Sequence, residues 1–425
     1  MYKLALKLMN KDGKGNLFYI ITIVITTAFI FNMINILFID GSGILDINER
    51  VIFTTPIYAV IFLIFFLIIY SNSYLSKLKS KEIAIEMISG VSIFKLGSAL
   101  AFQTLLLTVI GYFIGVVIGL FIVPLFCFLA KASGIYLISK EAFVFSAFIC
   151  ILQVACIGII NIGYGYRTSI SDLMRDRDGI GYIKDNKKRK ELSILDFRFF
   201  IYTVLPVGFI FISLDRQKEI AGLMAIVILI SIYGAISIVK IFMPKYIDKI
   251  KRKHLNNKIK LISLNNVKIK IVKNKVITYL IFSMSIGLIF SMQFLSGLDK
   301  FTLYSRITFM VTMILIAFMI IYRSFFEGIE ESKVFKGLLL IGFRKDDIKN
   351  IIKIELKYFY GIIIGIPLIV IIIFLVILMM KGIIDYIFLI SYILIYFVIM
   401  GITTAISYIG NLKIMKSEFD MEGEL

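Results

Sequence analysis

Ten long apolar runs, separated by short polar or basic segments, make up most of this chain. They lie at residues 17–39, 51–70, 96–130, 142–163, 199–214, 220–243, 276–296, 301–322, 358–380 and 383–410. About 20 consecutive apolar residues in a helix are enough to cross the hydrocarbon core of a bilayer. The pattern therefore predicts an all-α polytopic membrane protein with about ten transmembrane helices.

The segment before the third run, at about residues 77–91, has an amphipathic helical period. Ile83, Met87 and Val91 recur on one face, and charged residues supply the others, namely Lys79, Lys81, Glu82 and Glu86. Gly90 suits the left-handed position that follows a helix end, and Ser92 suits the N-cap of the next helix. The segment is predicted to be a short helix beside the membrane, joined by a tight corner to a spanning helix.

The spanning helix after this corner has glycine at every fourth position, at Gly111, Gly115 and Gly119. Residues four apart share one helix face, and a face of glycines lets another helix backbone approach closely. We therefore expect a second helix to pack on these three glycines.

The same layout of amphipathic helix, glycine, charged turn and long apolar helix recurs at residues 333–367. Gly342 stands where Gly90 does, and Gly361 and Gly365 again lie four apart. A repeat of motif and topology together indicates two related units in a 4+2+4 arrangement of helices. The predicted parts are a first unit at 1–170, a linker with two spans and a basic loop at 171–260, a second unit at 261–412 with its linking helix at about 329–342, and a tail at 413–425.

Composition and charge give the class and the orientation. The chain is 60% hydrophobic with a mean hydropathy of +0.95, outside the range of soluble globular proteins. Its net charge is +19, and the predicted outer loops hold eight basic residues, so that the other 39 of the 47 lie on the inner side. This asymmetry predicts that both termini and residues 76–95 are cytoplasmic.

Basic residues gather directly after the sixth predicted span, at Lys245, Lys249, Lys251, Arg252, Lys253, Lys258 and Lys260. Anionic lipid headgroups attract basic segments next to a membrane span. We therefore expect membrane lipids as partners of this segment, and no nucleic acid.

The run KEIAIEMISGVS and the glycine-spaced helix after it resemble the core motif of the FtsX-like permease family of ABC transporters. In that family a Gly–x–Ser corner separates a cytoplasmic coupling helix, which docks on the ATPase subunit, from the third spanning helix. The alternative is an ordinary amphipathic surface helix before a membrane span. The resemblance implies a role in ATPase coupling for Lys81, Glu82, Glu86, Gly90 and Ser92, and in the second copy for Lys333, Lys336, Gly342 and Arg344.

Across nearly its whole length the chain resembles the ten-helix permeases of the bacitracin-export (BceAB) type, with two departures. In the second copy Val334 replaces the glutamate and Arg344 the capping serine, so that Asp346 or Asp347 is expected to cap the turn. The large extracellular domain of those permeases is missing, because only residues 297–300 separate the seventh and eighth predicted spans. Capture of peptides by such a domain is therefore not expected here.

Catalytic and metal-binding patterns are missing from the sequence, as is a phosphate-binding loop. Within the predicted spans we find the amides Gln103, Gln153, Asn161 and Gln293, but no acid, lysine or arginine near a bilayer centre. An ion-coupled carrier would need a buried ionisable group, and a channel would need a polar stripe along a helix. We therefore expect no catalytic residue, metal or cofactor in this chain, with ATP bound on a partner subunit.

The sequence thus predicts the permease subunit of an ABC transporter in the bacterial cell membrane, with two copies of a separate ATPase. It would move or extract an amphipathic or lipid-associated substrate, a task that fits antimicrobial peptide resistance. The alternative hypothesis is a non-transporting FtsX-like regulator that relays ATPase motion to a sensor histidine kinase or a cell-wall enzyme.

Overall fold

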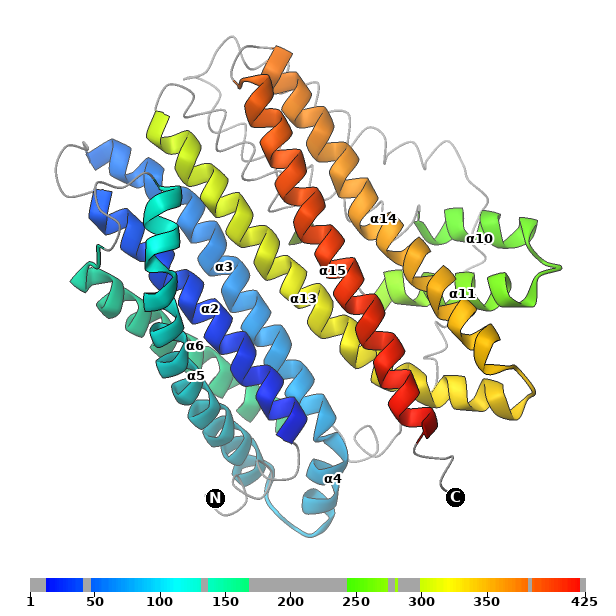
Figure 1. The fold of residues 1–425 in the computed structure, drawn as a ribbon. Helices are drawn as coiled ribbons and strands as arrows, with labels where there is room; N and C mark the ends of the chain where they lie inside the picture. Colours follow the sequence, from blue (N-terminus) through cyan, green and yellow to red (C-terminus); the bar gives the residue numbers. More distant parts are fainter. Residues whose placement is uncertain are drawn as a thin grey trace. The chain divides into compact units, whose positions relative to one another are not determined.

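The computed structural model describes residues 13–40, 47–130, 137–167, 243–273, 280–281, 299–380 and 384–420. These residues are almost all helical, and none of them forms a strand. Seven of the described helices are long and apolar enough to cross a membrane (Figure 1). The chain is therefore an all-helical, multi-pass membrane protein, as the sequence predicts.

The seven candidate spans coincide with seven of the ten predicted apolar runs. Predicted spans 199–214 and 220–243 lie outside the described residues except Met243, and 276–296 lies outside them except Leu280 and Ile281. The ten-helix 4+2+4 arrangement therefore stays a prediction.

The described part of the first unit, Met1–Tyr182, contains four long helices and one short one. These are α2 (Gly13–Asp40), α3 (Ile47–Leu78), α4 (Ser80–Ile88), α5 (Ile93–Leu129) and α6 (Lys140–Arg167). Helix α2 contacts α3, α5 and α6, and it has the most buried span of the four. The bundle is thus built around α2.

Asn35 fixes one end of α2 to the start of α6. Its Nδ2 donates to the carbonyl oxygen of Leu137 at 2.9 Å, and its Oδ1 accepts from the backbone N–H of Ser139 at 2.8 Å. The Ser139 hydroxyl then accepts from the N–H of Ala142 in the first turn of α6. Backbone groups that the helix itself leaves unpaired are satisfied in this way.

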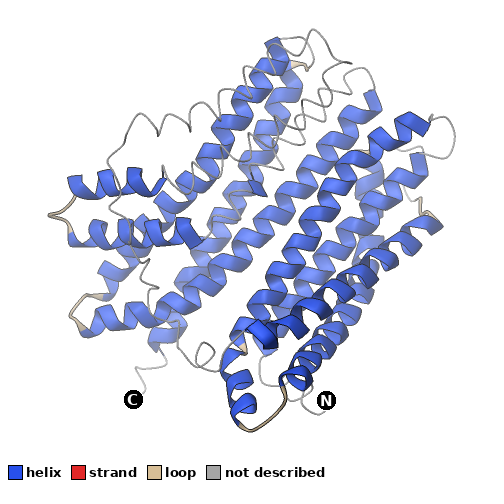
Figure 2. Cartoon of the chain, turned by 180° about the vertical axis from the view of Figure 1, so that it is seen from behind, coloured by secondary structure: helices blue, strands red, loops and turns tan. Residues whose placement is uncertain are grey.

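The described part of the second unit, Ile183–Leu425, contains three long helices and a helical hairpin. These are α10 (Met243–Lys253), α11 (Lys258–Lys273), α13 (Asp299–Leu340), α14 (Lys345–Met380) and α15 (Tyr386–Asp420). Helix α15 packs on α13 and α14, while α10 and α11 lie side by side and α11 packs on α14 (Figures 1 and 2). The predicted linker at 171–260 thus contributes α10 to this unit.

The second linking helix differs from the prediction. Residues 329–340 are not a separate helix but the last turns of α13, which runs unbroken from its apolar part, although these turns take a different direction (Figure 1). In the first unit the helix is interrupted at Lys79, which separates α3 from α4. Phe326 and Phe335 are buried before and after the expected break, and no proline stands in residues 323–340, so the residue types do not interrupt the hydrogen-bond ladder of α13.

Helix α14 also starts earlier than the apolar pattern indicates, at Lys345 and not near residue 358. As a result the buried acid Glu355 lies within the candidate span Lys345–Ile373. A second buried acid, Glu327 of α13, lies within the candidate span Arg306–Gly328. Each of them is near the end of its span that adjoins residues 333–348. Buried carboxylates require a partner.

Candidate coupling corners

The two predicted corners have the same backbone conformation. We call residues 80–96 the first corner and residues 333–348 the second corner. Each contains a glycine with positive φ, 86° at Gly90 and 100° at Gly342. No atom lies within 4 Å of where a Cβ would be built at either glycine. The backbone angle, and not crowding, therefore favours glycine at both positions.

Both corners end their first helix with the same pair of backbone hydrogen bonds. In the first, Gly90 N–H donates to the Met87 carbonyl and Val91 N–H to that of Glu86, both at 3.1 Å. In the second, Gly342 N–H donates to the Leu339 carbonyl at 2.9 Å and Phe343 N–H to that of Leu338 at 3.1 Å. This is the Schellman arrangement, which turns the chain sharply at a helix end.

The helices that follow the corners start differently. Ser92 is the N-cap residue of α5, but its side chain makes no capping bond. In the second corner Asp347 Oδ2 accepts from the backbone N–H of Arg344 at 3.1 Å. This is the bond that an N3 side chain makes to the N-cap backbone in a capping box, so Asp347, of the two aspartates expected to cap the turn, makes a capping bond here.

The inner face of the first corner is packed on the bundle. Ile83 and Ala84 of α4 form a buried cluster with Leu96 and Leu100 of α5. Met87, Val91 and Tyr164 of α6 pack against it. Displacement of α4 therefore acts directly on α5 and α6, because packed side chains transmit force with little compression.

The outer face of each corner is apolar. Ile88 is 62% exposed and Leu340 is 90% exposed, and each stands two residues before the glycine. Ile85, Phe94 and Ile341 are exposed beside them. Four of these five residues lie outside the candidate membrane spans. The fifth, Phe94, is at the start of the span in α5. Clustered exposed apolar residues mark interaction surfaces.

The predicted coupling charges are less prominent. Glu82, Glu86 and Lys336 are partly buried and each interacts within the chain. Lys81 and Lys333 belong to α4 and α13, and their side chains lie outside what is described. Ser92 and Arg344 are exposed at the corners. The corners thus also expose isoleucine and leucine side chains, which charge patterning does not single out.

A polar cluster lies at the base of the first corner. Asn16 of α2 accepts two hydrogen bonds at its Oδ1, from Gln103 Nε2 of α5 at 2.9 Å and from Lys79 Nζ at 3.4 Å. Lys79 precedes α4 and is only 1% exposed. This first polar cluster ties the chain on both sides of the corner to α2.

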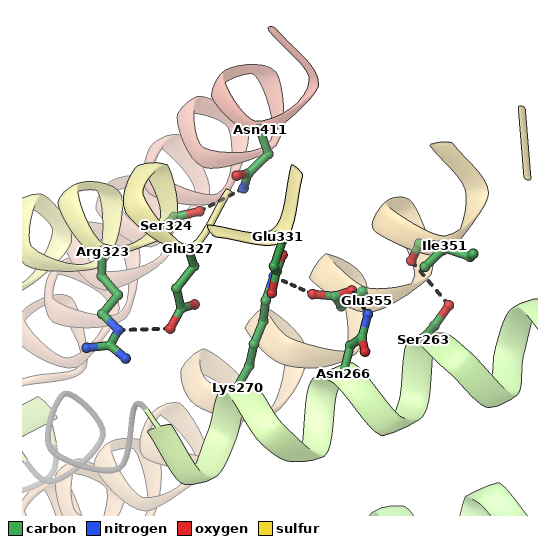
Figure 3. A network of polar contacts seen from close by, with 10 residues as sticks. All are labelled: Ser263, Asn266, Lys270, Arg323, Ser324, Glu327, Glu331, Ile351, Glu355 and Asn411. Atoms are coloured by element: carbon green, nitrogen blue, oxygen red, sulfur yellow. Dashed lines mark hydrogen bonds and ion pairs between the residues drawn. The ribbon is translucent and has the colours of Figure 1, made fainter. Parts of the chain in front are cut away.

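A second polar cluster lies at the base of the second corner (Figure 3). Lys270 of α11 reaches between Glu331 of α13 and Glu355 of α14, and it forms an ion pair with each, at 2.8 Å with Glu331. Asn266 donates to the other oxygen of Glu355 at 3.1 Å, and the Ser263 hydroxyl donates to the carbonyl of Ile351 at 3.2 Å. Lys270 is thus the partner that buried Glu355 requires, while Glu327 pairs with Arg323 at 2.9 Å.

Burial and charge act in opposite directions on this cluster. Burial by itself lowers the pKa of Lys270, but Glu331, Glu355 and Glu327 together raise it above its usual value. Burial raises the pKa of Glu331 to about 8, and the charge of Glu355 adds to this effect while Lys270 opposes it. Glu331 therefore titrates near neutral pH, and Lys270 stays charged there.

The two clusters occupy equivalent positions. Gly90 and Gly342 are 252 positions apart in the chain. The same separation relates Gln103 to Glu355 and Lys79 to Glu331, so both flanking members of each cluster match. The third members, Asn16 and Lys270, come from different helices before the corner. The repeat seen in the sequence therefore extends to side-chain contacts.

Amides and hydroxyls also join α3 to α6 in the first unit and α13 to α15 in the second unit. Asn72 Nδ2 donates to Asn161 Oδ1 at 2.7 Å, and Asn161 donates to the Thr104 hydroxyl at 3.0 Å. In the second unit Asn411 donates to the Ser324 hydroxyl at 2.8 Å, and Ser324 is 252 positions after Asn72. Gln153 is buried, whereas Gln293 lies outside the described residues. Such bonds hold helices together in a membrane.

The predicted glycine faces behave differently in the two units. A Cβ at Gly115 would lie 2.7 Å from Thr27 Cβ and 2.9 Å from the Val24 carbonyl of α2. Gly111 and Gly119 have similarly close neighbours on α2, at 2.8 and 3.2 Å. Gly361 and Gly365 have no neighbour within 4 Å among the described residues. Close helix approach thus requires glycine in α5 but not in the described surroundings of α14.

Comparison with protein-family models and with curated proteins gave no match. The class of the chain, a multi-pass helical membrane protein, therefore comes from its fold, and the functional argument comes from the two corners.

Proposed function

We propose that this chain is the membrane subunit of an ABC transporter, and that its two corners dock on a separate ATPase, one copy at each corner. In this proposal the corners lie on the cytoplasmic side of a bacterial cell membrane. ATP binds to the partner, and this chain converts the partner's motion into movement of an amphipathic or lipid-associated substrate.

The observation that carries the proposal is the equivalence of Ile88 and Leu340. The two residues stand at the same place in two corners with the same backbone, and both are exposed. An exposed leucine alone is ordinary. Two exposed apolar groups at repeat-related positions, each the last residue of a helix and outside the candidate spans, support two equivalent docking sites.

A route from each corner into the bundle supports the same function. In the first unit a displacement of α4 would pass through Ile83 to Leu96 and through Lys79 to Asn16 of α2. In the second unit it would pass through Glu331 to Lys270 of α11. Each route ends on helices that cross the membrane or pack on one that does, so partner motion can change how the spans are arranged.

Site-specific photocrosslinking in cells tests the proposal. A photoreactive amino acid placed at position 88 or 340 should capture a protein that binds and hydrolyses ATP. The same amino acid at position 397, where Phe397 is 67% exposed on the apolar face of α15, is the matched control and should capture no ATPase. Capture at neither corner, or of a protein without ATPase activity, would contradict the proposal.

A further inference from the structure

The outer face of α10 is strongly cationic. Tyr246, Lys249, Arg252 and Lys253 are exposed and recur at helical spacing, while Met243, Pro244 and Ile247 are buried on the other side. The helix thus separates a face of three cations and one aromatic ring from an apolar face that packs within the unit.

The cations of this face have no acidic partner in the described part of the chain. Asp248 is the one acid among residues 243–273, and both of its oxygens accept from Lys268 of α11 at 2.8 Å. Lys251 donates to Asn265 at 3.1 Å and so also faces α11. Lys249, Arg252 and Lys253 therefore present their charge outward, and like charges so close together favour an anionic partner.

The hairpin of α10 and α11 is held beside a membrane-spanning helix. Ser263 bonds the backbone of α14 at Ile351, and Asn266 and Lys270 bond Glu355. Both contacted residues lie within the candidate span Lys345–Ile373. The hairpin is therefore fixed beside the first part of this candidate span, where we expect the headgroup region of a bilayer.

We propose that the face of Tyr246, Lys249, Arg252 and Lys253 binds the headgroups of anionic phospholipids in the surrounding bilayer. Phosphate oxygens accept hydrogen bonds from lysine and arginine, and aromatic side chains favour the membrane interface. The position next to a span favours this partner over a soluble acidic protein. Through Lys270, the bound hairpin would also hold the second polar cluster against the membrane.

The lack of tryptophan in this chain allows a direct test. Tyr246→Trp places a single fluorophore on the face, and bromine on a lipid acyl chain quenches tryptophan on contact. The full-length protein is placed in nanodiscs of phosphatidylglycerol and phosphatidylcholine at one fixed ratio, with bromine on one lipid or on the other. We expect brominated phosphatidylglycerol to quench more strongly, with an enrichment of about fivefold per cation at low salt.

Three further measurements decide the proposal. Lys249→Gln, Arg252→Gln and Lys253→Gln together should remove the preference, whereas Lys95→Gln, Lys353→Gln and Lys357→Gln, which neutralise three exposed lysines elsewhere, should retain it. Inorganic phosphate at constant ionic strength should not change the quenching. Equal quenching by the two lipids, an unchanged preference in the first triple variant, or displacement by phosphate would each overturn the proposal. No ATPase is present, so the result is independent of the proposed docking function.

Discussion

Gln103 and Glu355 occupy the same position in the two units, each 13 residues after the positive-φ glycine of its corner. Gln103 donates to an amide oxygen on α2, whereas Glu355 binds the ammonium group of Lys270 on α11. In the first unit a neutral donor (Gln103) and a cationic donor (Lys79) thus share a neutral acceptor, the amide oxygen of Asn16. In the second unit the equivalent position forms an ion pair. The second cluster should consequently respond more strongly to charge and to pH.

Removal of Lys270 should destabilise the second unit. Lys270→Met leaves Glu355, which is 1% exposed, without its cation. Breaking a buried ion pair from one side costs about 3–5 kcal/mol. Lys349→Met removes the lysine of an exposed pair with Asp346 on the same helix as Glu355, and it should cost less than about 1 kcal/mol. Thermal unfolding in detergent measures both, and equal effects would contradict the importance of the cluster.

Stability should fall as the pH rises from about 5 to about 8. The pKa of Glu331 is raised by burial, so the folded chain keeps a proton that the unfolded chain loses near the ordinary carboxyl pKa. The stability contributed by that proton is complete below the unfolded pKa and is lost as the pH passes the folded pKa. Glu331→Gln imitates the protonated side chain and should flatten the profile of melting temperature against pH in this range. A variant with the wild-type slope would assign the dependence to another group.

The α2–α5 contact should tolerate no side chain at its closest point. Gly115→Ala places a methyl group against Thr27 and the Val24 carbonyl and should cost about 1–3 kcal/mol. Gly365→Ala is the matched control on α14, where the site is open, and it should be neutral or stabilise the helix by up to about 1 kcal/mol. Melting temperatures of the two variants should move apart. A loss at Gly365 as large as that at Gly115 would contradict the packing difference.

The corner glycines should be needed for their backbone angle. Gly90→Val forces a β-branched residue to a φ of 86° and should cost about 1–3 kcal/mol at the corner. Asparagine adopts this region more readily, so Gly90→Asn should have a smaller effect. If the first corner couples to an ATPase, stimulated ATP hydrolysis should fall in the valine variant while the protein still inserts in the membrane. Equal activity of the two variants would show that the angle is not required.

The spans and the corners could be predicted because their signals are local. Apolar runs locate seven described helices to within several residues at most ends, and Gly90 and Gly342 mark both turns. The polar clusters could not be predicted in this way. Lys79 stands in a charged segment and Lys270 in a basic segment, and both segments have the composition of a solvent-exposed surface. Their burial depends on helices distant in sequence, which no local pattern reports.

One signal for the clusters was nevertheless available. Extending the register of Gly90 and Gly342 along the chain pairs Gln103, an amide already noticed within a span, with Glu355. The pair is not evident from the apolar pattern, because charged residues in the first turns of α14 make the apolar run start only near residue 358, after Glu355. The exposed Ile88 and Leu340 were missed for another reason, because an apolar residue in an amphipathic helix is expected to face inward.

Native mass spectrometry of the complex with the ATPase captured at the corners tests the central claim most directly. The wild type should carry two ATPase copies, Ile88→Glu and Leu340→Glu one each, and the double variant none, because a buried carboxylate without a partner opposes docking. Leu255→Glu, which adds a carboxylate at a site 64% exposed in the α10–α11 loop, should keep both copies. Two ATPase copies on the double variant, or none on the wild type, would contradict the account.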